Sequence, residues 1–211
     1  MKKKLIVLLI VTVLVVLTTF LAGLFGQLID ILWLKLLINI ALNIINGVFA
    51  IIGIQLSGVK IDFCWKEWKQ YLIGLGICIV LSLFIAWIPV LCGFSLVGSH
   101  TDFVLWKFVY NFFYYLLIIG PVEELLFRVY YQETITSLFK THQWVGVIIA
   151  SAIFGLWHLI NGSFIQVLLT FGIGCVFGFA KHYIKELHYP GVALSHGLYD
   201  FLNYIVRLTI V

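Results

Sequence analysis

The sequence predicts an all-α fold, a polytopic membrane helix bundle with seven or eight transmembrane helices. Hydrophobic residues make up 63% of the 211 positions and charged residues only 10%, and the mean hydropathy is +1.14, which is far from globular composition. Apolar stretches that could each cross about 30 Å of hydrocarbon recur along the chain. Basic residues fall between these stretches instead of forming one stripe, so we expect no nucleic-acid partner.

The first apolar run predicts an uncleaved membrane span. It follows three lysines at positions 2 to 4 and extends from Leu5 to Gly26. A cleavable signal peptide has a hydrophobic region of about 7 to 15 residues and a small-residue cleavage site, whereas this run is longer and has no clear site. Further spans are predicted near residues 36–54, 71–94, 144–160, 164–181 and 191–209.

The stretch from about 104 to 139 predicts one long, kinked helix. Gly120-Pro121 interrupts it, and proline removes a backbone donor and clashes with the preceding turn. No polar loop separates the two halves, so we expect a kink and seven spans. A true break at this point would give eight.

Seven spans with a cytoplasmic amino terminus agree with the distribution of basic residues. On this topology only Lys35, Lys107 and Arg207 lie outside, as the positive-inside rule expects. We therefore predict a multi-pass protein of the cell membrane, with residues 1–211 forming a single integral membrane domain. The lysines predicted on the cytoplasmic side are Lys2, Lys3, Lys4, Lys60, Lys66, Lys69, Lys140, Lys181 and Lys185.

Two patterns of small and polar residues are explained by helix packing. Asn39, Asn43 and Asn46 recur on one face of the second span, where amides can bond across helices. Gly174-x-x-x-Gly178 lets a neighbouring backbone approach closely. We expect both patterns to serve helix association and not transport.

Three polar clusters interrupt the apolar helices and indicate chemistry, because ionisable groups at membrane depth are costly unless paired or hydrated. The first is Glu123-Glu124-x-x-x-Arg128. Glu124 and Arg128 stand one turn apart and are predicted to pair, while Glu123 points roughly 100° away and can act as a general base. The alternative is that all three residues lie at a water interface.

The other two clusters each contain a histidine. Phe154 precedes His158 by one turn and should pack on the same face. His196 and Asp200 are also one turn apart, so the carboxylate can orient the imidazole or both can aim at one centre. The alternative for each histidine is a satisfied core residue.

Helix rise allows a test of depth. Counted from the turn near residues 140–143, Glu123 and His158 both lie roughly 20 to 25 Å away and can meet at one level. His196 comes only about 8 Å after Pro190. The third cluster is therefore expected nearer the cytoplasmic face, unless the last helix is tilted or begins deep in the bundle.

The motifs E-E-x-x-x-R, F-x-x-x-H and H-x-x-x-[N/D], in this order on successive helices, resemble the CAAX protease and bacteriocin-processing family of intramembrane proteases. The resemblance covers about residues 105–205. It implies an all-α bundle with a water-filled polar cavity inside the membrane. It further implies that Glu123 and His158 activate a water molecule, and that His196 with Asp200 stabilises the oxyanion or holds a metal.

The resemblance also assigns supporting roles. Glu124 and Arg128 are implied to be structural, and Phe154 to place His158. Two positions differ from the family pattern: Val129 follows Arg128 where glycine is usual, and Asp200 stands where many members have asparagine. Because an ionised aspartate only accepts hydrogen bonds, Asp200 must be protonated, act through His196 or bind a cation.

The sequence leaves the metal question open. Glu123, His158, His196 and Asp200 offer nitrogen and oxygen ligands that suit a divalent metal such as zinc, with a position left for water. In a metal-free scheme Glu123 takes a proton from water and imidazole donors stabilise the tetrahedral intermediate. No other cofactor is expected.

We weigh two functions. The first is an intramembrane endopeptidase whose partners are the lipid bilayer and a hydrophobic or lipidated peptide or protein substrate. The second is a non-proteolytic membrane regulator or bacteriocin-immunity protein that binds another membrane protein through its helices. A transporter is disfavoured because the polar residues have no inverted counterpart early in the chain.

Overall fold

The protein is built from helices joined by short segments. The computed structural model describes residues 1–139, 141–160 and 162–210, and these residues form helices and no strand. The predicted all-α class is therefore confirmed.

The helices coincide with the apolar stretches of the sequence. The α-helices are α1 (Lys2–Leu28), α2 (Leu32–Ser57), α3 (Lys69–Ser82), α4 (Ile88–Leu91), α5 (Leu105–Tyr114), α6 (Gly120–Glu124), α7 (Gln132–Thr136), α8 (Gln143–Trp157), α9 (Phe164–Tyr183) and α10 (Tyr189–Thr209). The remaining helical segments are the π-helical η1 (Leu83–Trp87), η2 (Tyr115–Ile119) and η3 (Leu125–Tyr131) and the 3-10 turn η4 (His158–Ile160).

Several helices meet the length and polarity that a membrane span requires. Within the described part of the chain there are five of them: Lys2–Leu28, Leu32–Ser57, Lys69–Leu91, Gln143–Ile160 and Phe164–Tyr183. The helical stretches 105–136 and 189–209 carry the Glu-Glu-Arg and His-Asp clusters. The chain is thus a multi-pass membrane protein, and its seven or eight spans and cytoplasmic amino terminus stay predictions. Lys140, which contributes to the predicted sidedness, lies outside the described residues.

Residues 105–136 are helical throughout, as the sequence predicts for this stretch. The π-helical segment η2 lies directly before Gly120-Pro121, and η3 directly follows Glu124. Because Pro121 has no N–H, the ordinary backbone bond of its turn is missing, and wider π-helical turns adapt the helix around such a gap. Proline therefore changes the winding of this helix without inserting a loop.

Contacts within the chain divide it into two compact units. Unit 1 contains Met1–Asp62 and Val122–Lys185, and unit 2 contains Phe63–Pro121 and Glu186–Val211. The boundary falls within α6, so each unit combines two separate stretches of sequence. The single domain over residues 1–211 stays a prediction.

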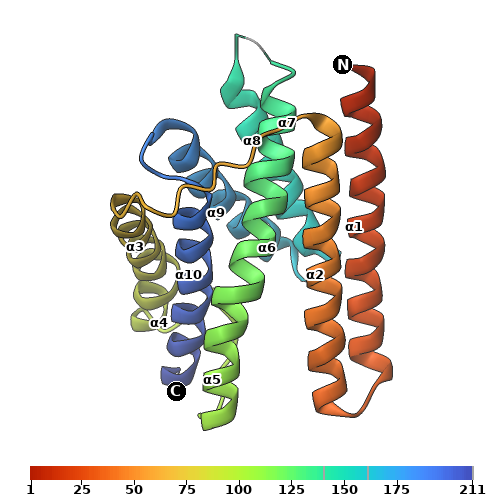
Figure 1. Cartoon of the computed structure of the whole chain (residues 1–211). Helices are drawn as coiled ribbons and strands as arrows, with labels where there is room; N and C mark the ends of the chain where they lie inside the picture. The colour runs from red at the N-terminus through yellow and green to blue at the C-terminus, as the bar shows by residue number, and fades with distance from the viewer. Residues whose placement is uncertain (140, 161, 211) are drawn as a thin grey trace. The chain divides into compact units, whose positions relative to one another are not determined.

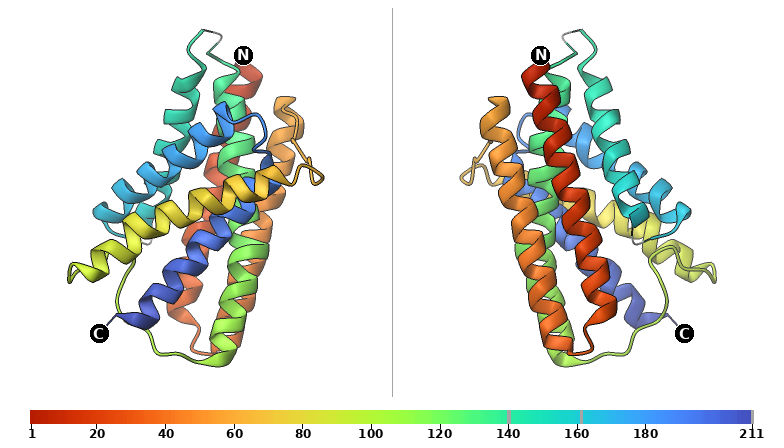
Figure 2. Two further views of the ribbon diagram at one scale, coloured as in Figure 1. Left: turned by 90° about the vertical axis from the view of Figure 1, so that its left-hand side faces the viewer. Right: turned by 90° about the vertical axis from the view of Figure 1, so that its right-hand side faces the viewer.

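In unit 1, α1 and α2 lie side by side (Figure 1, Figure 2). The Thr18 hydroxyl of α1 donates to the Asn46 side chain of α2, which confirms the predicted interhelical role of Asn46. Asn43 instead donates to the Asn39 carbonyl within α2, so the interhelical role predicted for it is not seen in this bond. On this face, Asn46 therefore bonds across to α1, whereas Asn43 bonds within α2.

The helices α8 and α9 of unit 1 pack closely through glycines. A Cβ added at Gly174 would lie 3.2 Å from the Ser151 Cβ, and one added at Gly178 would lie 2.8 Å from a methyl group of Val147. The close approach predicted from Gly174-x-x-x-Gly178 is confirmed.

In unit 2, α10 packs against α3 and against the helix formed by α5 and η2 (Figure 1). The rings of Phe108 and Phe112 each meet the Phe201 ring edge to face at 5.1 Å. One turn earlier on α10, a Cβ added at Gly197 would lie 2.5 Å from the Tyr115 carbonyl oxygen. Aromatic rings join α10 to α5, and direct backbone contact joins α10 to η2.

Candidate active site

The Glu-Glu-Arg cluster is buried in unit 1. Glu123 and Glu124 end α6, and Arg128 lies in the middle of η3. The Glu124 and Arg128 side chains are fully buried, with Glu124 Oε2 3.4 Å from Arg128 Nε. The predicted pairing is confirmed, and the burial contradicts the alternative of a simple water-interface location for these two residues. Glu123 is buried as well, at 8% exposure.

Arg128 also connects η3 to α8. Its guanidinium carbon lies 4.9 Å from the centre of the Phe154 ring, within the range of a cation–π interaction. The Phe127 ring meets the same Phe154 ring at 4.9 Å. The charge of Arg128 is therefore held by a carboxylate on its own helix and by an aromatic ring on the next.

His158 is fixed at the carboxyl end of α8. Its ring meets the Phe154 ring edge to face at 4.7 Å, which confirms that both lie on one face. Its Nδ1 is 2.8 Å from the Phe154 carbonyl oxygen. Because a carbonyl only accepts, Nδ1 carries the proton in this bond and Nε2 holds the lone pair of the neutral ring. The helix thus sets the tautomer as well as the position of His158.

Contacts between the two helices of this cluster set their register. Arg128 contacts Phe154. Thr136 follows Arg128 by eight residues, Gly146 precedes Phe154 by eight residues, and a Cβ on Gly146 would lie 2.6 Å from the Thr136 nitrogen. Residue numbers rise on one helix as they fall on the other, so the helices run antiparallel. Continued by four residues, this register brings Glu124 level with His158, and Glu123 is the next residue. The register supports the predicted common level of Glu123 and His158.

The third cluster lies on α10 in unit 2. His196 is buried, and its Nε2 is 3.6 Å from Asp200 Oδ2, one turn later. The partly exposed carboxylate is thus near enough to orient the imidazole, as predicted. The next residue, Gly197, is in backbone contact with the helix that carries Tyr115.

The structure brings together the members of each cluster within its own unit. Glu124, Arg128, Phe154 and His158 form one connected set of contacts in unit 1. His196 and Asp200 form a pair in unit 2. Convergence of the two sets, and the depth predicted for the third cluster, stay predictions.

Glu123, His158, His196 and Asp200 are the predicted candidates for metal ligands. Among residues 1–139, 141–160 and 162–210, no group of three or more His, Cys, Asp or Glu side chains is arranged to hold a metal ion.

Two aromatic residues beside the Phe154–His158 pair, Trp157 and Phe127, were not predicted from the sequence. The Trp157 ring lies 5.6 Å from the His158 ring and 5.0 Å from the Phe127 ring. Its indole N–H donates to the Thr19 hydroxyl on α1 at 2.7 Å. The adjacency of Trp157 to His158 was visible in the sequence, but nothing there indicated the bond to α1.

The comparison with protein families agrees with the predicted resemblance. Residues 105–202 match the family model for Rce1-like proteins, described as type II CAAX prenyl endopeptidase Rce1-like. This segment contains every residue predicted for the site. No curated protein and no solved structure gives a significant match. The resemblance that the motifs predict is therefore confirmed over residues 105–202, which are similar to the CAAX protease type of family.

Proposed function

We propose that the protein is an intramembrane endopeptidase that hydrolyses a peptide bond in a hydrophobic or lipidated peptide or protein. Its multiple apolar helices and the family match of residues 105–202 support this class of activity. A reacting site buried among such helices excludes bulk water and selects substrates that enter from the lipid. The bilayer is then both the environment of the enzyme and the route of its substrate.

The observation that carries the proposal is the register of η3 against α8. It supports a common level for Glu123 and His158, while Arg128 neutralises Glu124 next to them. Two adjacent buried carboxylates thereby receive different roles, since one has a cationic partner on its own helix. The general base is assigned to Glu123 because it lies on another side of the helix from this ion pair.

In the proposed reaction Glu123 takes a proton from a water molecule that His158 orients through Nε2. The resulting hydroxide attacks the carbonyl carbon of the substrate, and the carbonyl oxygen becomes an oxyanion. The protonated Glu123 then gives its proton to the leaving nitrogen as the C–N bond breaks. The products are a carboxylic acid and an amine, so atoms and charges balance.

His196 is proposed to stabilise the oxyanion, with Asp200 as its orienting partner. An imidazolium donates from both nitrogens, so it can bond to the Asp200 carboxylate through Nε2 and to an oxyanion through Nδ1.

The test is cleavage by the purified full chain in lipid vesicles, with a panel of hydrophobic and lipid-anchored fluorogenic peptides. Glu123→Gln and His158→Ala should each reduce kcat/KM at least about 100-fold, which is the usual contribution of a positioned acid–base group. The folded fraction should be unchanged, as measured by size-exclusion chromatography and circular dichroism.

Two matched variants control for the substitutions themselves. Glu186→Gln removes an exposed carboxylate, and His142→Ala removes an exposed imidazole at the start of α8. Both should cleave at the wild-type rate. Wild-type turnover in Glu123→Gln or in His158→Ala would overturn the assignment, as would a wild-type chain that cleaves no member of the panel.

A further inference from the structure

Gln70, near the start of α3, is a fully buried amide with hydrogen bonds at both ends. Its Oε1 accepts from the backbone N–H of Gly191 on α10 at 2.9 Å. Its Nε2 donates to the Cys64 carbonyl oxygen in the segment before α3. Both bonds lie within unit 2, and neither belongs to the motifs of the predicted site.

The bond to Gly191 acts as a helix cap that comes from another helix. The first N–H groups of a helix have no complete set of partners inside it, and a side-chain oxygen normally supplies one. His188, which precedes α10, makes no side-chain cap bond. The Gly191 N–H also donates to the His188 carbonyl oxygen at 3.1 Å, so Gln70 adds a second acceptor from α3 and ties the first turn of α10 to that helix.

A second turn of the same two helices is tied in the same way. Ser195 Oγ donates to the Gly74 carbonyl oxygen at 2.7 Å. A Cβ added at Gly74 would lie 2.7 Å from the Gly191 carbonyl oxygen, so the backbones are in contact between the two bonds. Hydrogen bonds at two successive turns oppose sliding of α10 along α3 and rotation of α10 against α3.

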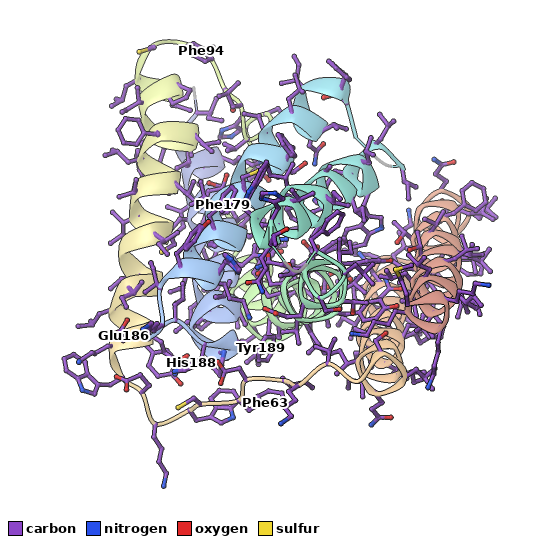
Figure 3. The ribbon with its side chains drawn as sticks, turned by 90° about the horizontal axis from the view of Figure 1, so that it is seen from above. Phe63, Phe94, Phe179, Glu186, His188 and Tyr189 are labelled. Atoms are coloured by element: carbon purple, nitrogen blue, oxygen red, sulfur yellow. The ribbon has the colours of Figure 1, made fainter. Side chains whose placement is uncertain are left out.

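The segment before α3 also contacts the first turn of α10, near the hydrogen bond between Gln70 and Gly191. Phe63 in this segment meets the Tyr189 ring of α10 edge to face at 5.1 Å (Figure 3). The bond from Gln70 to the Cys64 carbonyl holds the residue next to Phe63. Gln70 thus joins three pieces of unit 2: the segment 63–68, α3 and the first turn of α10.

The second of these hydrogen bonds, made by Ser195, lies next to the predicted site residues of unit 2. His196 follows Ser195, and its Nε2 lies 3.6 Å from Asp200. We propose that Gln70 is a positioning residue, which fixes the axial place and the rotation of α10 and thereby the direction of the His196 imidazole. This inference rests on the proposed function, because it assigns His196 to the reaction.

The main test compares Gln70→Met with Gln70→Glu in the purified full chain. Methionine has similar length but makes neither hydrogen bond. Glutamate keeps an oxygen that can accept from Gly191 and, in the protonated form that burial favours, an O–H that can donate to the Cys64 carbonyl. We expect Gln70→Met to lower kcat at least 10-fold with KM changed less than twofold. Gln70→Glu should restore kcat to within about threefold of wild type, since the cap is retained.

A second measurement does not depend on turnover. Reaction of histidines with diethyl pyrocarbonate is followed for each residue by mass spectrometry. Release of α10 in Gln70→Met should raise the rate at the buried His196 at least fivefold, with the exposed His142 unchanged. In Gln70→Glu the rate at His196 should stay within twofold of wild type.

Gln55→Leu is the matched control, because Gln55 is an exposed glutamine on α2 in unit 1. It should leave both kcat and the His196 rate unchanged. If Gln70→Met does not fold, the milder Ser195→Ala should raise the His196 rate at least twofold. An unchanged rate at His196 in the variant that folds overturns the inference, whether or not the wild type cleaves peptides. An inactive wild type with the expected labelling overturns only the proposed function.

Discussion

The two units hold their histidines by different means. In unit 1, His158 ends a helix among aromatic rings, and the nearby charge of Arg128 is buried against Glu124 and Phe154. In unit 2, His196 lies between Ser195 and Gly197 on a helix whose backbone touches its neighbours. One histidine is placed by rings and an ion pair, and the other by close backbone contacts at glycine and by the hydrogen bonds of Gln70 and Ser195.

This difference predicts different weaknesses. Rings can shift slightly to fill space, but a buried charge that loses its partner has no such remedy. A backbone contact does not depend on a charge, but it leaves no space for an added carbon atom. Unit 1 should therefore be most sensitive to lost groups and unit 2 to added ones.

The largest effect is expected from Arg128→Met in unit 1. It leaves the fully buried Glu124 carboxylate without its cation, and such a loss typically costs about 3 to 5 kcal/mol. The free energy of unfolding, measured in bicelles by steric trapping, should fall by this amount.

A second ion pair of unit 1 provides the control. Lys181 Nζ lies 3.0 Å from Glu133 Oε1, but the Glu133 side chain is 36% exposed. Lys181→Met should cost no more than about 1 kcal/mol, because water can solvate the remaining carboxylate. Equal losses for the two variants would show that burial of the Glu124–Arg128 pair is not what makes it important.

Much of the fold could be predicted from the sequence. In lipid the backbone N–H and C=O groups must bond to each other, so an apolar stretch of membrane length forms a helix. The helices appear where the hydropathy places them, and residues 105–136 remain one helix despite Pro121. The π-helical turns of η2 and η3 could not be predicted, since they depend on how the helix backbone adjusts around Pro121, which has no N–H to donate. The division into two units also escaped prediction, because it depends on contacts between stretches far apart in sequence.

The site shows the same limit at the level of single residues. Pairs one turn apart, such as Glu124 with Arg128 and Phe154 with His158, were predictable because helix geometry alone brings them together. The bond between Gln70 and Gly191 was not predictable, because it joins residues 121 positions apart. Spacing rules therefore identify the residues of the clusters, but not the residues that hold them in place.

The next effect in size is expected from Gly197→Ala in unit 2. The added carbon would lie 2.5 Å from the Tyr115 oxygen and 2.9 Å from the Leu116 Cα, both backbone atoms that cannot turn away. Overpacking of this kind typically costs about 1 to 3 kcal/mol in the free energy of unfolding.

The same substitution at an open site separates packing from helix propensity. Gly172 lies in α9, and a Cβ there would meet no atom within 4 Å. Gly172→Ala should leave the free energy of unfolding unchanged or raise it by about 0.5 to 1 kcal/mol, because alanine is the better helix former. If both variants gain stability, close packing of unit 2 around His196 is refuted.

The smallest effect concerns the support that α1 gives to His158. Trp157→Phe keeps a ring beside Phe127 but removes the N–H that donates to the Thr19 hydroxyl at 2.7 Å. Hydrogen bonds between membrane helices average about 0.6 kcal/mol, so a loss of this order is expected. Combined with Thr19→Val in a double-mutant cycle, the coupling energy should equal most of the loss in Trp157→Phe. A coupling of zero would mean that rings alone hold the end of α8, whereas a positive coupling would make α1, which carries none of the site motifs, part of what places His158.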